Sequence, residues 1–338
     1  MTKIAIIGAG VSGLIAARDL TFCADVTLFD KSRGLGGRAA TRYATPYEFD
    51  HGCQFIQGQS TEFNRFLEGL VEQRILKRWD ARFAEIDSGE ITHQRQWGAD
   101  QPHYVPRNRM NMLGHHLAEG LDVIREAQIT GLNRKNDGWY VTHHMKSEYG
   151  PFDWVISAIP SKQAADILPE EFTHLEVISN RKMGGCFSLM LGFDTPLPTE
   201  WDAAVVKNAN ISWVAINSSK PERSDAFSVL INSTNNWADK YLDDDRNWVQ
   251  EYLLTEAIKV TNLPLHQASH KALHLWRYAN IESQAGKPAS YIDFDNNLAA
   301  IGDWCVKGRI EGAFKSAKDL SKQLLPVLDQ KRFNLISA

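Results

Sequence analysis

The stretch KIAIIGAGVSGLIAARDLTFCADVTLFD, residues 3–30, decides the fold of this 338-residue chain. It opens at residues 3–7 with a short apolar run rich in β-branched side chains, which predicts a buried parallel strand. Three glycines follow within six residues, and residues 14–20 then carry the spacing of apolar side chains that is typical of a helix. Residues 25–29 predict a second strand. The stretch therefore predicts a strand–helix–strand unit of a parallel α/β sheet.

The three glycines have the spacing G-x-G-x-x-G, and each of them meets a different physical need. Gly8 permits the tight turn out of the strand, Gly10 lets a pyrophosphate approach the backbone, and Gly13 lets the helix pack closely on the strand. The helix that begins near Ser12 directs unpaired N–H groups and a partial positive charge at the phosphates. Asp30 ends the second strand, where a carboxylate can accept a hydrogen bond from a ribose hydroxyl. In this context the motif predicts a dinucleotide site.

The loop after Asp30 reads KSRGLGGRAAT, residues 31–41, and it indicates which dinucleotide is bound. Alone, this loop predicts no more than a flexible, solvated basic segment. Directly after a ribose-binding acid, however, Gly37 and Arg38 would place bare backbone and a guanidinium beside the same pyrophosphate, with Lys31 as a further contact. The stretch resembles the second fingerprint of the flavin-containing amine oxidase superfamily, in which the glycine pair and the arginine hold FAD. The resemblance implies FAD rather than NAD as the cofactor.

The composition argues against several other classes of protein. A net charge of -4 gives no basic surface for nucleic acid or an anionic membrane, and no stretch is long and apolar enough to span a bilayer. The N-terminal apolar run is interrupted by the glycines of the nucleotide motif, so it does not resemble a signal peptide. The four cysteines are scattered without a C-x-x-C pair, which is typical of reduced cytosolic thiols. We expect a cytoplasmic protein without a bound metal, a nucleic-acid partner or a membrane anchor.

The middle of the chain predicts a second domain. The pattern changes near residue 161, after which short strands succeed one another without helices between them, as in an antiparallel sheet. These strands are expected at residues 186–193, 203–206, 211–217, 227–231 and 271–279. A hairpin is expected at residues 83–97, and helices are expected at residues 62–79 and 237–260.

We therefore expect an α/β protein with two domains. A Rossmann-type FAD-binding domain, discontinuous in the sequence, would combine residues 1–62, 100–160 and 291–338. An α+β substrate domain with a mostly antiparallel sheet would comprise residues 63–99 and 161–290.

Two further segments resemble parts of the amine oxidase superfamily that contact FAD. Residues 50–55, DHGCQF, match the stretch that lies along the flavin ring, which implies contacts from Gln54 and Phe55. Residues 155–160, VISAIP, match the run that closes the nucleotide domain in monoamine oxidases. Relative to that run, Ile129 falls where a backbone amide of the family meets the adenine ring.

The C-terminal segment carries a third match to the superfamily. An apolar strand expected at residues 298–301 is followed by GDW and then by GRIEGAF at the start of a helix. The resemblance implies that Asp303 accepts a hydrogen bond from a ribityl hydroxyl of FAD. The helix that opens near Ile310 would direct its N–H groups and its dipole at the N1–C2=O edge of the flavin, where they stabilise negative charge.

Within the superfamily, the sequence resembles the renalase family most closely. The matching runs are FDKSRGLGGR (29–38), HGCQF (51–55), WRYA (276–279) and GDWCVKGRIEGA (302–313). Members of that family hold FAD noncovalently and oxidise isomers of NAD(P)H that are reduced at the 2- or 6-position, giving NAD(P)+ and passing the electrons to O2 as H2O2. The resemblance implies a dihydronicotinamide dinucleotide and O2 as the small-molecule partners.

Two features differ from a monoamine oxidase. Residues 273–279 hold no cysteine that could bind the flavin covalently, and alignment of the E-G-A motif places Arg309 where those enzymes have a tyrosine. A cation there would repel an ammonium substrate and favour an anionic or nucleotide ligand. Arg309 would instead face solvent if it paired with a carboxylate such as that of Glu311.

The catalytic residues are left unassigned. A dihydronicotinamide is a strong hydride donor, and the flavin N5 needs only the correct distance and orientation to accept the hydride, so no protein base is required. Several aromatic and polar side chains are candidates for the substrate pocket, although each is as consistent with core packing. They are the rings Trp276, Tyr278 and Trp304 and the polar groups His274, Arg277 and Arg309.

The sequence leaves two other functions open. A flavin-dependent amine or amino-acid oxidase would share every cofactor motif, and rapid flavin reduction by a primary amine would identify it. A flavin-binding regulatory protein without catalysis would hold FAD that no reductant reduces at a useful rate. A dithiol reductase is disfavoured, because the sequence has no cysteine pair.

Overall fold

The computed structural model describes residues 1–281 and 288–336, with side chains described up to residue 330. The chain divides into two compact units: unit 1 comprises Met1–Gly37, Leu113–Met183 and Ile281–Ala338, and unit 2 comprises Arg38–Met112 and Gly184–Asn280. Compared with the expected domains, residues 38–62 and 100–112 fall in unit 2, and residues 161–183, 281 and 288–290 fall in unit 1. The expected ranges also include residues 282–287 and 337–338, which lie outside the described residues.

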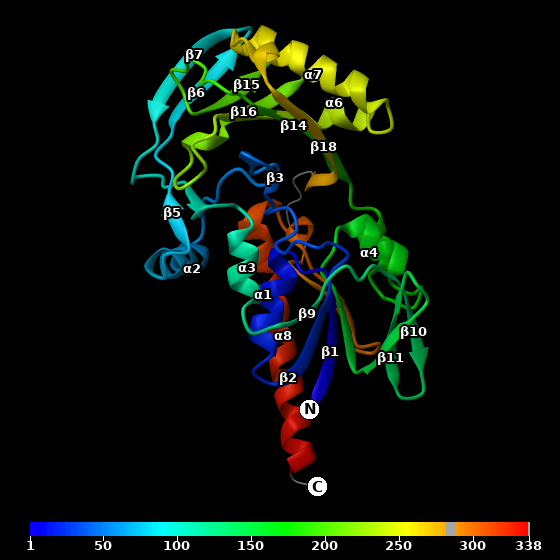
Figure 1. The fold of residues 1–338 in the computed structure, drawn as a ribbon. Coiled ribbons are helices and arrows are strands. Elements are labelled where there is room, and N and C mark those ends of the chain that lie inside the picture. The colour runs from blue at the N-terminus through cyan, green and yellow to red at the C-terminus, as the bar shows by residue number, and fades with distance from the viewer. Residues whose placement is uncertain (282–287, 337–338) are drawn as a thin grey trace. The chain divides into compact units, whose positions relative to one another are not determined.

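A six-stranded, mainly parallel sheet forms the centre of unit 1 (Figure 1). The order along the sheet is β19, β20, β13, β1, β2, β9, and β19–β20 is the antiparallel pair among them. The strands span Tyr291–Asp293 (β19), Leu298–Ala300 (β20), Trp154–Ser157 (β13), Thr2–Ile7 (β1), Ala24–Phe29 (β2) and Asp122–Ile124 (β9). With α1 (Val11–Leu20) between β1 and β2, the strand–helix–strand unit predicted from residues 3–30 is confirmed.

Helices and a small antiparallel sheet complete unit 1. The long helix α8 (Arg309–Ile336) follows β20 and contacts α1. The shorter helices are α3 (Met112–Ala118), α4 (Ser161–Ile167) and α5 (Leu175–Ser179), and the small sheet consists of β10 (Ile129–Lys135), β11 (Gly138–His143) and β12 (Glu148–Phe152). Apolar side chains of β1, β13 and β20 share one buried cluster with the small sheet, so burial of this common core holds the two sheets together.

A seven-stranded sheet forms the centre of unit 2, in the order β18, β14, β17, β16, β15, β6, β7. The strands span His270–Ile281 (β18), Met183–Gly192 (β14), Ser228–Ser233 (β17), Ile211–Ile216 (β16), Ala203–Lys207 (β15), Arg82–Asp87 (β6) and Glu90–Gln96 (β7). Pairing is antiparallel in β14–β17, β17–β16, β16–β15 and β6–β7, and parallel in β15–β6. The predicted α/β class, with a mostly antiparallel second sheet, is therefore confirmed.

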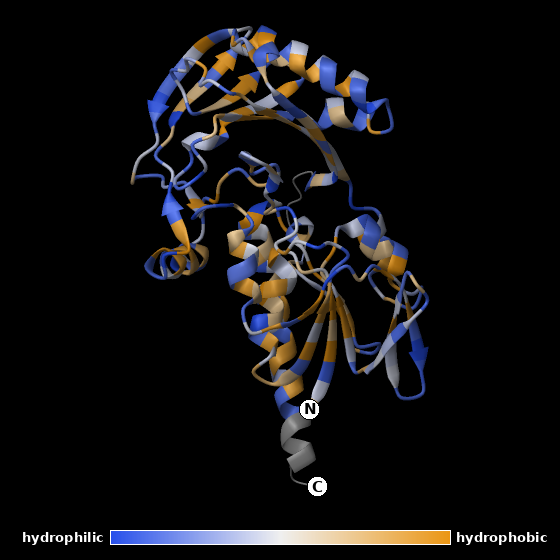
Figure 2. Ribbon diagram, in the orientation of Figure 1, coloured by the Kyte–Doolittle hydropathy of each residue, from blue (hydrophilic) through white to orange (hydrophobic). Residues whose placement is uncertain are grey.

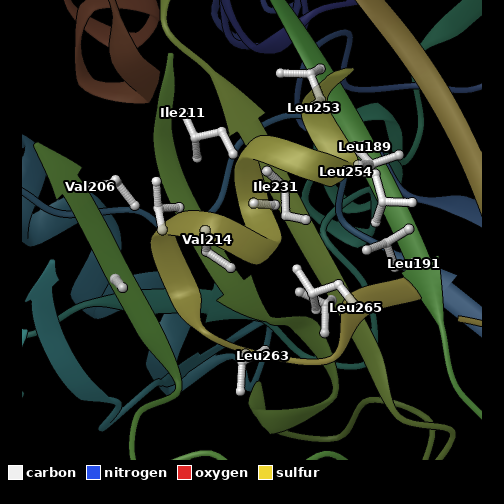
Figure 3. Packing of buried hydrophobic residues seen from close by; sticks show 14 of the residues in the cluster. Leu189, Leu191, Val206, Ile211, Val214, Ile231, Leu253, Leu254, Leu263 and Leu265 are labelled. Carbon is white, nitrogen blue, oxygen red and sulfur yellow. The ribbon is translucent and has the colours of Figure 1, made fainter. Parts of the chain in front are cut away.

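One face of this sheet is covered by α6 (Asn235–Lys240) and α7 (Arg246–Thr261). Leucine, isoleucine and valine side chains from the strands and from α7 interdigitate there in a continuous core (Figure 3). Figure 2 shows hydrophobic residues along the same strands. The core includes the buried side chains of Leu189, Val214, Ile231 and Leu253. Removal of this apolar area from water holds the helices on the sheet.

The second face of the seven-stranded sheet carries aromatic and polar side chains. Successive residues of a strand point to opposite faces, so the direct neighbours of the core residues face away from α7. By this rule the second face is formed by Phe83, Ser188, Trp213, His274 and Trp276. Two of the predicted pocket residues, His274 and Trp276, therefore lie on the same side of the sheet.

The helix expected at residues 62–79 is shorter than predicted. It is α2 (Thr61–Glu72), and Arg74, with a left-handed φ of 60°, stops its continuation. The chain then forms β5 (Leu76–Arg78), which pairs with β8 (Tyr104–Pro106). A further short hairpin of unit 2 joins β3 (Arg42–Ala44) to β4 (Tyr47–Phe49).

The single helix expected at residues 237–260 is also wrong, because the chain forms α6 and α7 there. The break has a local cause in Asp245. Its side chain accepts hydrogen bonds from the N–H groups of Asn247 and Trp248 and so caps a new helix.

Candidate functional site

The turn between β1 and α1 depends on two of its glycines. Gly8 has a φ of 110°, and a Cβ at that position would lie 2.8 Å from the carbonyl oxygen of Ala158. At Gly13 a Cβ would lie 2.0 Å from the carbonyl oxygen of Gly8, a distance at which the backbone would have to move. Glycine at these two positions lets α1 rest directly on the end of β1.

Gly10 differs from the other motif glycines, because it borders open space. A Cβ at Gly10 would meet no protein atom within 4 Å. Gly10 is also the N-cap of α1, so no side chain covers the first N–H groups of that helix. The loop glycine Gly36 donates from its N–H to the carbonyl of Ala9 at 2.9 Å, and Gly37 would place a Cβ 3.2 Å from the Cα of Gly10. Bare backbone thus surrounds a helix N-terminus, which is the arrangement that a pyrophosphate requires.

Asp30 fastens this turn to the second strand. Its carboxylate accepts hydrogen bonds from the N–H groups of Ala9 and Ser32, both at 2.7 Å. Asp30 is buried, whereas the neighbouring Lys31 is exposed. The acid therefore shapes the glycine turn and also stands at the end of β2, where the ribose contact is predicted. The sequence did not predict the first of these roles, because both donors are backbone groups.

The C-terminal motif lies beside the same turn within unit 1. The hydroxyl of Ser12 donates to the carbonyl of Ala313 at 3.1 Å, which joins the first turns of α1 and α8. A Cβ at Gly312 would lie 3.2 Å from the carbonyl oxygen of Asp303, so the start of α8 packs closely on the preceding turn. These contacts join Ser12 of the glycine turn to the start of α8, and the start of α8 to the turn at Asp303.

In unit 2 the segment at residues 50–55 lies on the second face of the seven-stranded sheet. The hydroxyl of Ser188 and the indole N–H of Trp276 both donate to the carbonyl oxygen of His51, each at 2.8 Å. These two side chains come from different strands, β14 and β18. The sheet therefore supports the backbone that is predicted to lie along the flavin ring.

Backbone carbonyls hold the predicted cofactor contacts Gln54 and Arg38. The amide nitrogen of Gln54 donates to the carbonyls of Asp50 and Gly52, at 2.6 and 3.0 Å. The guanidinium of Arg38 donates to the carbonyl of Ala279 at 2.8 Å. A Cβ at Gly52 would lie 2.0 Å from the carbonyl oxygen of Arg38, so the close approach of these two segments requires glycine.

A buried ion cluster lies beside this segment, and no pattern in the sequence predicts it. Asp50 is 0 % exposed, and its carboxylate accepts hydrogen bonds from Nε and Nη2 of Arg223, at 3.0 and 2.8 Å, and from Nζ of Lys220, at 3.3 Å. The same lysine donates to Oε1 of Gln54 at 3.3 Å. Although burial favours the neutral acid, the two cations lower the pKa of Asp50 to about 2. Burial lowers the pKa of Lys220 to about 8.

Two histidines and a tryptophan form a second group on the same face. The ring centroid of His51 lies 4.8 Å from that of His274 and 5.0 Å from that of Trp276. Burial lowers the pKa of His51 and of His274, each to about 4, and the positive charge of Arg42 acts on both in the same direction. Both imidazoles are therefore neutral and weakly basic at pH 7.

These shifts predict a loss of stability in acid. The folded-state pKa of both histidines lies below the ordinary value of 6.5, so the unfolded chain binds more protons as the pH falls from 6.5 towards 4. The free energy of unfolding should fall across this window and be fully retained above it. His274→Asn should flatten the slope of that free energy against pH in urea titrations, whereas the same change at the exposed His144 should not. Equal slopes in the wild type, the His274→Asn variant and the His144→Asn variant would contradict the lowered pKa of His274.

The other predicted pocket residues of β18 are divided between its two faces. Tyr278 follows His274 and Trp276 at intervals of two residues, so it lies on the second face with them. Arg277 points to the opposite face, where its guanidinium lies 2.6 Å from the carboxylate of the exposed Asp243. The structure therefore does not bring Arg277 together with the rings.

The remaining residues that were predicted to line the substrate pocket or contact FAD lie in unit 1, and each has different surroundings. Trp304 is buried, and its indole N–H donates to a backbone carbonyl at 3.0 Å. Arg309 is exposed at the first residue of α8 and has a φ of 66°. The carboxylate of Glu311 lies 2.7 Å from Nζ of Lys315. Ile129, which the family resemblance places at the adenine, opens β10 with a buried side chain.

All four cysteines of the chain are free thiols. Burial raises the pKa of Cys53 to about 11, so this residue beside Gln54 is a thiol rather than a thiolate at neutral pH. Among the described residues, no group of three or more His, Cys, Asp or Glu side chains is placed to hold a metal ion. None of the helices within the described ranges combines the length and the apolarity needed to cross a membrane.

Comparison with known proteins identifies both parts of the sequence. Residues 6–70 match the family model of the NAD(P)-binding Rossmann-like domain, and residues 78–325 match that of the flavin containing amine oxidoreductases. Solved structures with the same fold include a protein provisionally named protoporphyrinogen oxidase from Exiguobacterium sp. 255-15, with a TM-score of 0.76 and 12% identity over 96% of this chain and 98% of that chain. Putrescine oxidase bound to putrescine has a TM-score of 0.72 and 12% identity over 96% and 99%. Reduced UDP-galactopyranose mutase has a TM-score of 0.77 and 11% identity over 97% and 96%.

The second family match spans well over half of the 338 residues. The glycine turn fits the cofactor that this family carries, because the open space at Gly10 and the uncovered N-terminus of α1 suit the pyrophosphate of a dinucleotide. The chain therefore belongs to the flavin containing amine oxidoreductases and is an FAD-dependent oxidoreductase.

Proposed function

We propose that this oxidoreductase is a renalase-like oxidase, which converts 2- or 6-dihydro isomers of NAD(P)H to NAD(P)+. When bound, FAD supplies the two-electron acceptor for the dihydronicotinamide ring and passes the electrons to O2, giving H2O2. The side chains of the protein bind the cofactor, orient the substrate and set the charge around it. No side chain is assigned as a general acid or base.

The charge around the segment at residues 50–55 is the observation that carries this proposal. Asp50 is the acid of that segment, and it is already neutralised by Lys220 and Arg223 inside the unit. His51 and His274 are kept neutral by burial. The carboxylate of Asp50 is therefore not available to receive an ammonium ion. A neutral dihydronicotinamide needs no such partner.

The weak basicity of the two histidines supports the same choice of substrate. An alkylammonium must lose a proton before its nitrogen lone pair can take part in oxidation, and a base with a pKa near neutrality would promote this step. His51 and His274 each have a pKa of about 4, far below that range. A dihydronicotinamide has no ammonium proton to lose, so its oxidation does not depend on these residues as bases.

We further propose that FAD is bound noncovalently. The residues proposed to contact it are those that the sequence motifs indicate: Gly8, Gly10, Ser12, Gly13, Asp30, Lys31, Gly37, Arg38, Gln54, Phe55, Ile129, Asp303 and Ile310. The thiol state of Cys53 supports noncovalent binding, because a thiolate would be the nucleophile for a covalent link. The four free cysteines also support a cytoplasmic location.

A flavin-dependent amine oxidase is the second candidate. The family to which the chain belongs and its likeness in fold to putrescine oxidase favour this alternative. It requires an ammonium-binding group, and the charge around residues 50–55 does not provide one.

The products of aerobic turnover distinguish the two candidates. We expect one O2 to be consumed for each 6-dihydro-NAD, and one NAD+ and one H2O2 to be formed. Absorbance measures the conversion of the nicotinamide, and an oxygen electrode measures the consumption of O2. Putrescine, benzylamine and a panel of amino acids serve as the comparison and should give no ammonia. Ammonia and H2O2 from any of these amines, with no NAD+ from the isomer, would overturn the proposal.

A further inference from the structure

Arg42 lies on the side of a short hairpin that faces the seven-stranded sheet. In the β3–β4 hairpin Arg42 is paired with Phe49, and side chains directly opposite each other in an antiparallel pair lie on the same face. The ring of Phe49 stacks on that of His270 in β18, with centroids 5.8 Å apart. Arg42 is therefore directed toward the second face of the sheet, on which His274 and Trp276 also lie.

The guanidinium of Arg42 is close enough to the histidines of this face to affect their protonation. Its positive charge lowers the pKa of both His51 and His274, in addition to the effect of burial. The ring of His274 meets that of Trp276 edge-on, with centroids 4.4 Å apart. Arg42, His274 and Trp276 thus form a group in which a cation lies beside a pair of aromatic rings. We call this group the Arg42 patch.

The charge of Arg42 differs from that of the buried cations of unit 2, because no carboxylate neutralises it. Lys220 and Arg223 are both paired with Asp50. Within the part of the chain that the structure describes, no hydrogen bond or ion pair engages the guanidinium of Arg42. Arg42 is exposed and the two rings of the patch are half-buried, so all three side chains retain surface that a ligand can contact.

An unpaired guanidinium is suited to an anion, and to a phosphate in particular. Its N–H donors form a planar fork that can bind two oxygens of one phosphate group. His51 and His274 are neutral at pH 7, so the guanidinium supplies the charge of the patch. The neighbouring aromatic rings suit a planar group of the same ligand. The combination favours a ligand that carries both a phosphate group and a flat ring, which is the chemistry of a nucleotide.

We infer that Arg42 binds the pyrophosphate of the dinucleotide substrate and thereby favours a dinucleotide over a nicotinamide compound without phosphate. The inference rests on the proposed function and adds a specificity-determining residue that the sequence motifs do not indicate. The pyrophosphate of FAD is proposed to bind at the glycine turn, with Gly10 and Gly37, so it does not require Arg42. A contact to the pyrophosphate takes no part in hydride transfer, so its loss should raise the Kd of the substrate without slowing reduction of the flavin.

The test compares two substrates that differ in phosphate. The holoenzyme is mixed anaerobically with increasing 6-dihydro-NAD or with the phosphate-free 6-dihydronicotinamide riboside, and the rate of flavin bleaching is fitted to give a Kd and a limiting rate. Arg42→Gln should raise the Kd of 6-dihydro-NAD about three- to tenfold and leave that of the riboside unchanged. The limiting rates, the FAD content and the Tm should stay those of the wild type.

Two further variants and a salt titration complete the comparison. Arg42→Lys keeps the positive charge and should recover part of the lost affinity. Arg277→Gln is the matched control, because Arg277 lies on the opposite face of β18 and is paired with Asp243, so neither Kd should change. Added salt should raise the Kd of 6-dihydro-NAD in the wild type but not that of the riboside, since it screens the charge of Arg42. This last measurement tests the same contact without a substitution.

The outcomes separate the inference from the proposed function. An unchanged Kd of 6-dihydro-NAD in Arg42→Gln, or equal increases for both substrates, would overturn the inference and leave the proposed function standing. Loss of FAD from Arg42→Gln would also overturn it, because the residue would then belong to the cofactor site. A wild-type flavin that neither compound bleaches would overturn both.

Discussion

Gly10→Ala should yield a folded protein that has lost most of its FAD. The new methyl group meets no protein atom within 4 Å, so the fold loses nothing, but it projects into the space assigned to the pyrophosphate. A steric conflict of this size should weaken FAD binding about ten- to hundredfold. The measurement is the ratio of flavin to protein absorbance after purification, together with the Tm of the apoprotein of variant and wild type.

Gly13→Ala is the matched control, because it adds the same methyl group three residues further on. There the Cβ would lie 2.0 Å from the carbonyl oxygen of Gly8, so α1 must move away from β1. The free energy of unfolding should fall by about 1–3 kcal/mol, even for the apoprotein. A Gly10→Ala protein with the FAD content of the wild type would show that the dinucleotide does not cross this turn.

Asp50→Asn should strongly destabilise the folded protein. The variant leaves the guanidinium of Arg223 and the ammonium of Lys220 without their carboxylate in a region from which water is excluded. Breaking a buried ion pair by removing one partner costs about 3–5 kcal/mol in free energy of unfolding. Urea unfolding at pH 7 measures this difference. Asp243→Asn, which removes an exposed partner of Arg277, is the control and should have no measurable effect.

The lowered pKa of Asp50 also predicts how the stability of the folded protein changes in acid. Its folded-state pKa of about 2 is below the ordinary value of 3.8, so its contribution is complete above pH 3.8 and is lost as the pH falls towards 2. The wild type should lose stability in this window, and Asp50→Asn should lose less. Equal stability of the two proteins at pH 7 would show that the ion cluster does not hold the segment at residues 50–55.

The parts of the fold that the sequence predicts are those with a local cause. The strand–helix–strand unit at residues 3–30 follows from an apolar run, three glycines and a helical period, all within thirty residues. The antiparallel sheet follows from strand patterns that repeat without helices between them. Boundaries were less predictable, because a single residue in a left-handed conformation or a single cap, such as Arg74 or Asp245, ends or begins a helix.

The parts that the sequence does not predict depend on contacts between distant residues. Asp50 and Lys220 are 170 positions apart, and neither stands in a pattern that indicates an ion pair. Strand alternation could have separated Arg277 from Trp276, but the core-facing side was known only from the packing of α7.

Fold alone does not determine the reaction of this chain. Structures of similar TM-score include both putrescine oxidase and UDP-galactopyranose mutase, whose names denote different chemistry. At 11–12% identity these likenesses establish the arrangement of the chain and leave the substrate to be argued from the site. The neutralised Asp50 and the neutral histidines favour a neutral ring over an ammonium ion.

The most direct test of the proposed function is to mix the FAD-loaded protein anaerobically with 6-dihydro-NAD and, separately, with a primary amine, and to follow the flavin band. We predict fast bleaching by the nicotinamide isomer alone, with the colour restored and H2O2 formed when air is admitted. Bleaching by the amine alone would contradict the proposed function and make the protein an amine oxidase. A flavin that neither compound reduces would equally contradict it and would favour a flavin-binding protein without this catalysis.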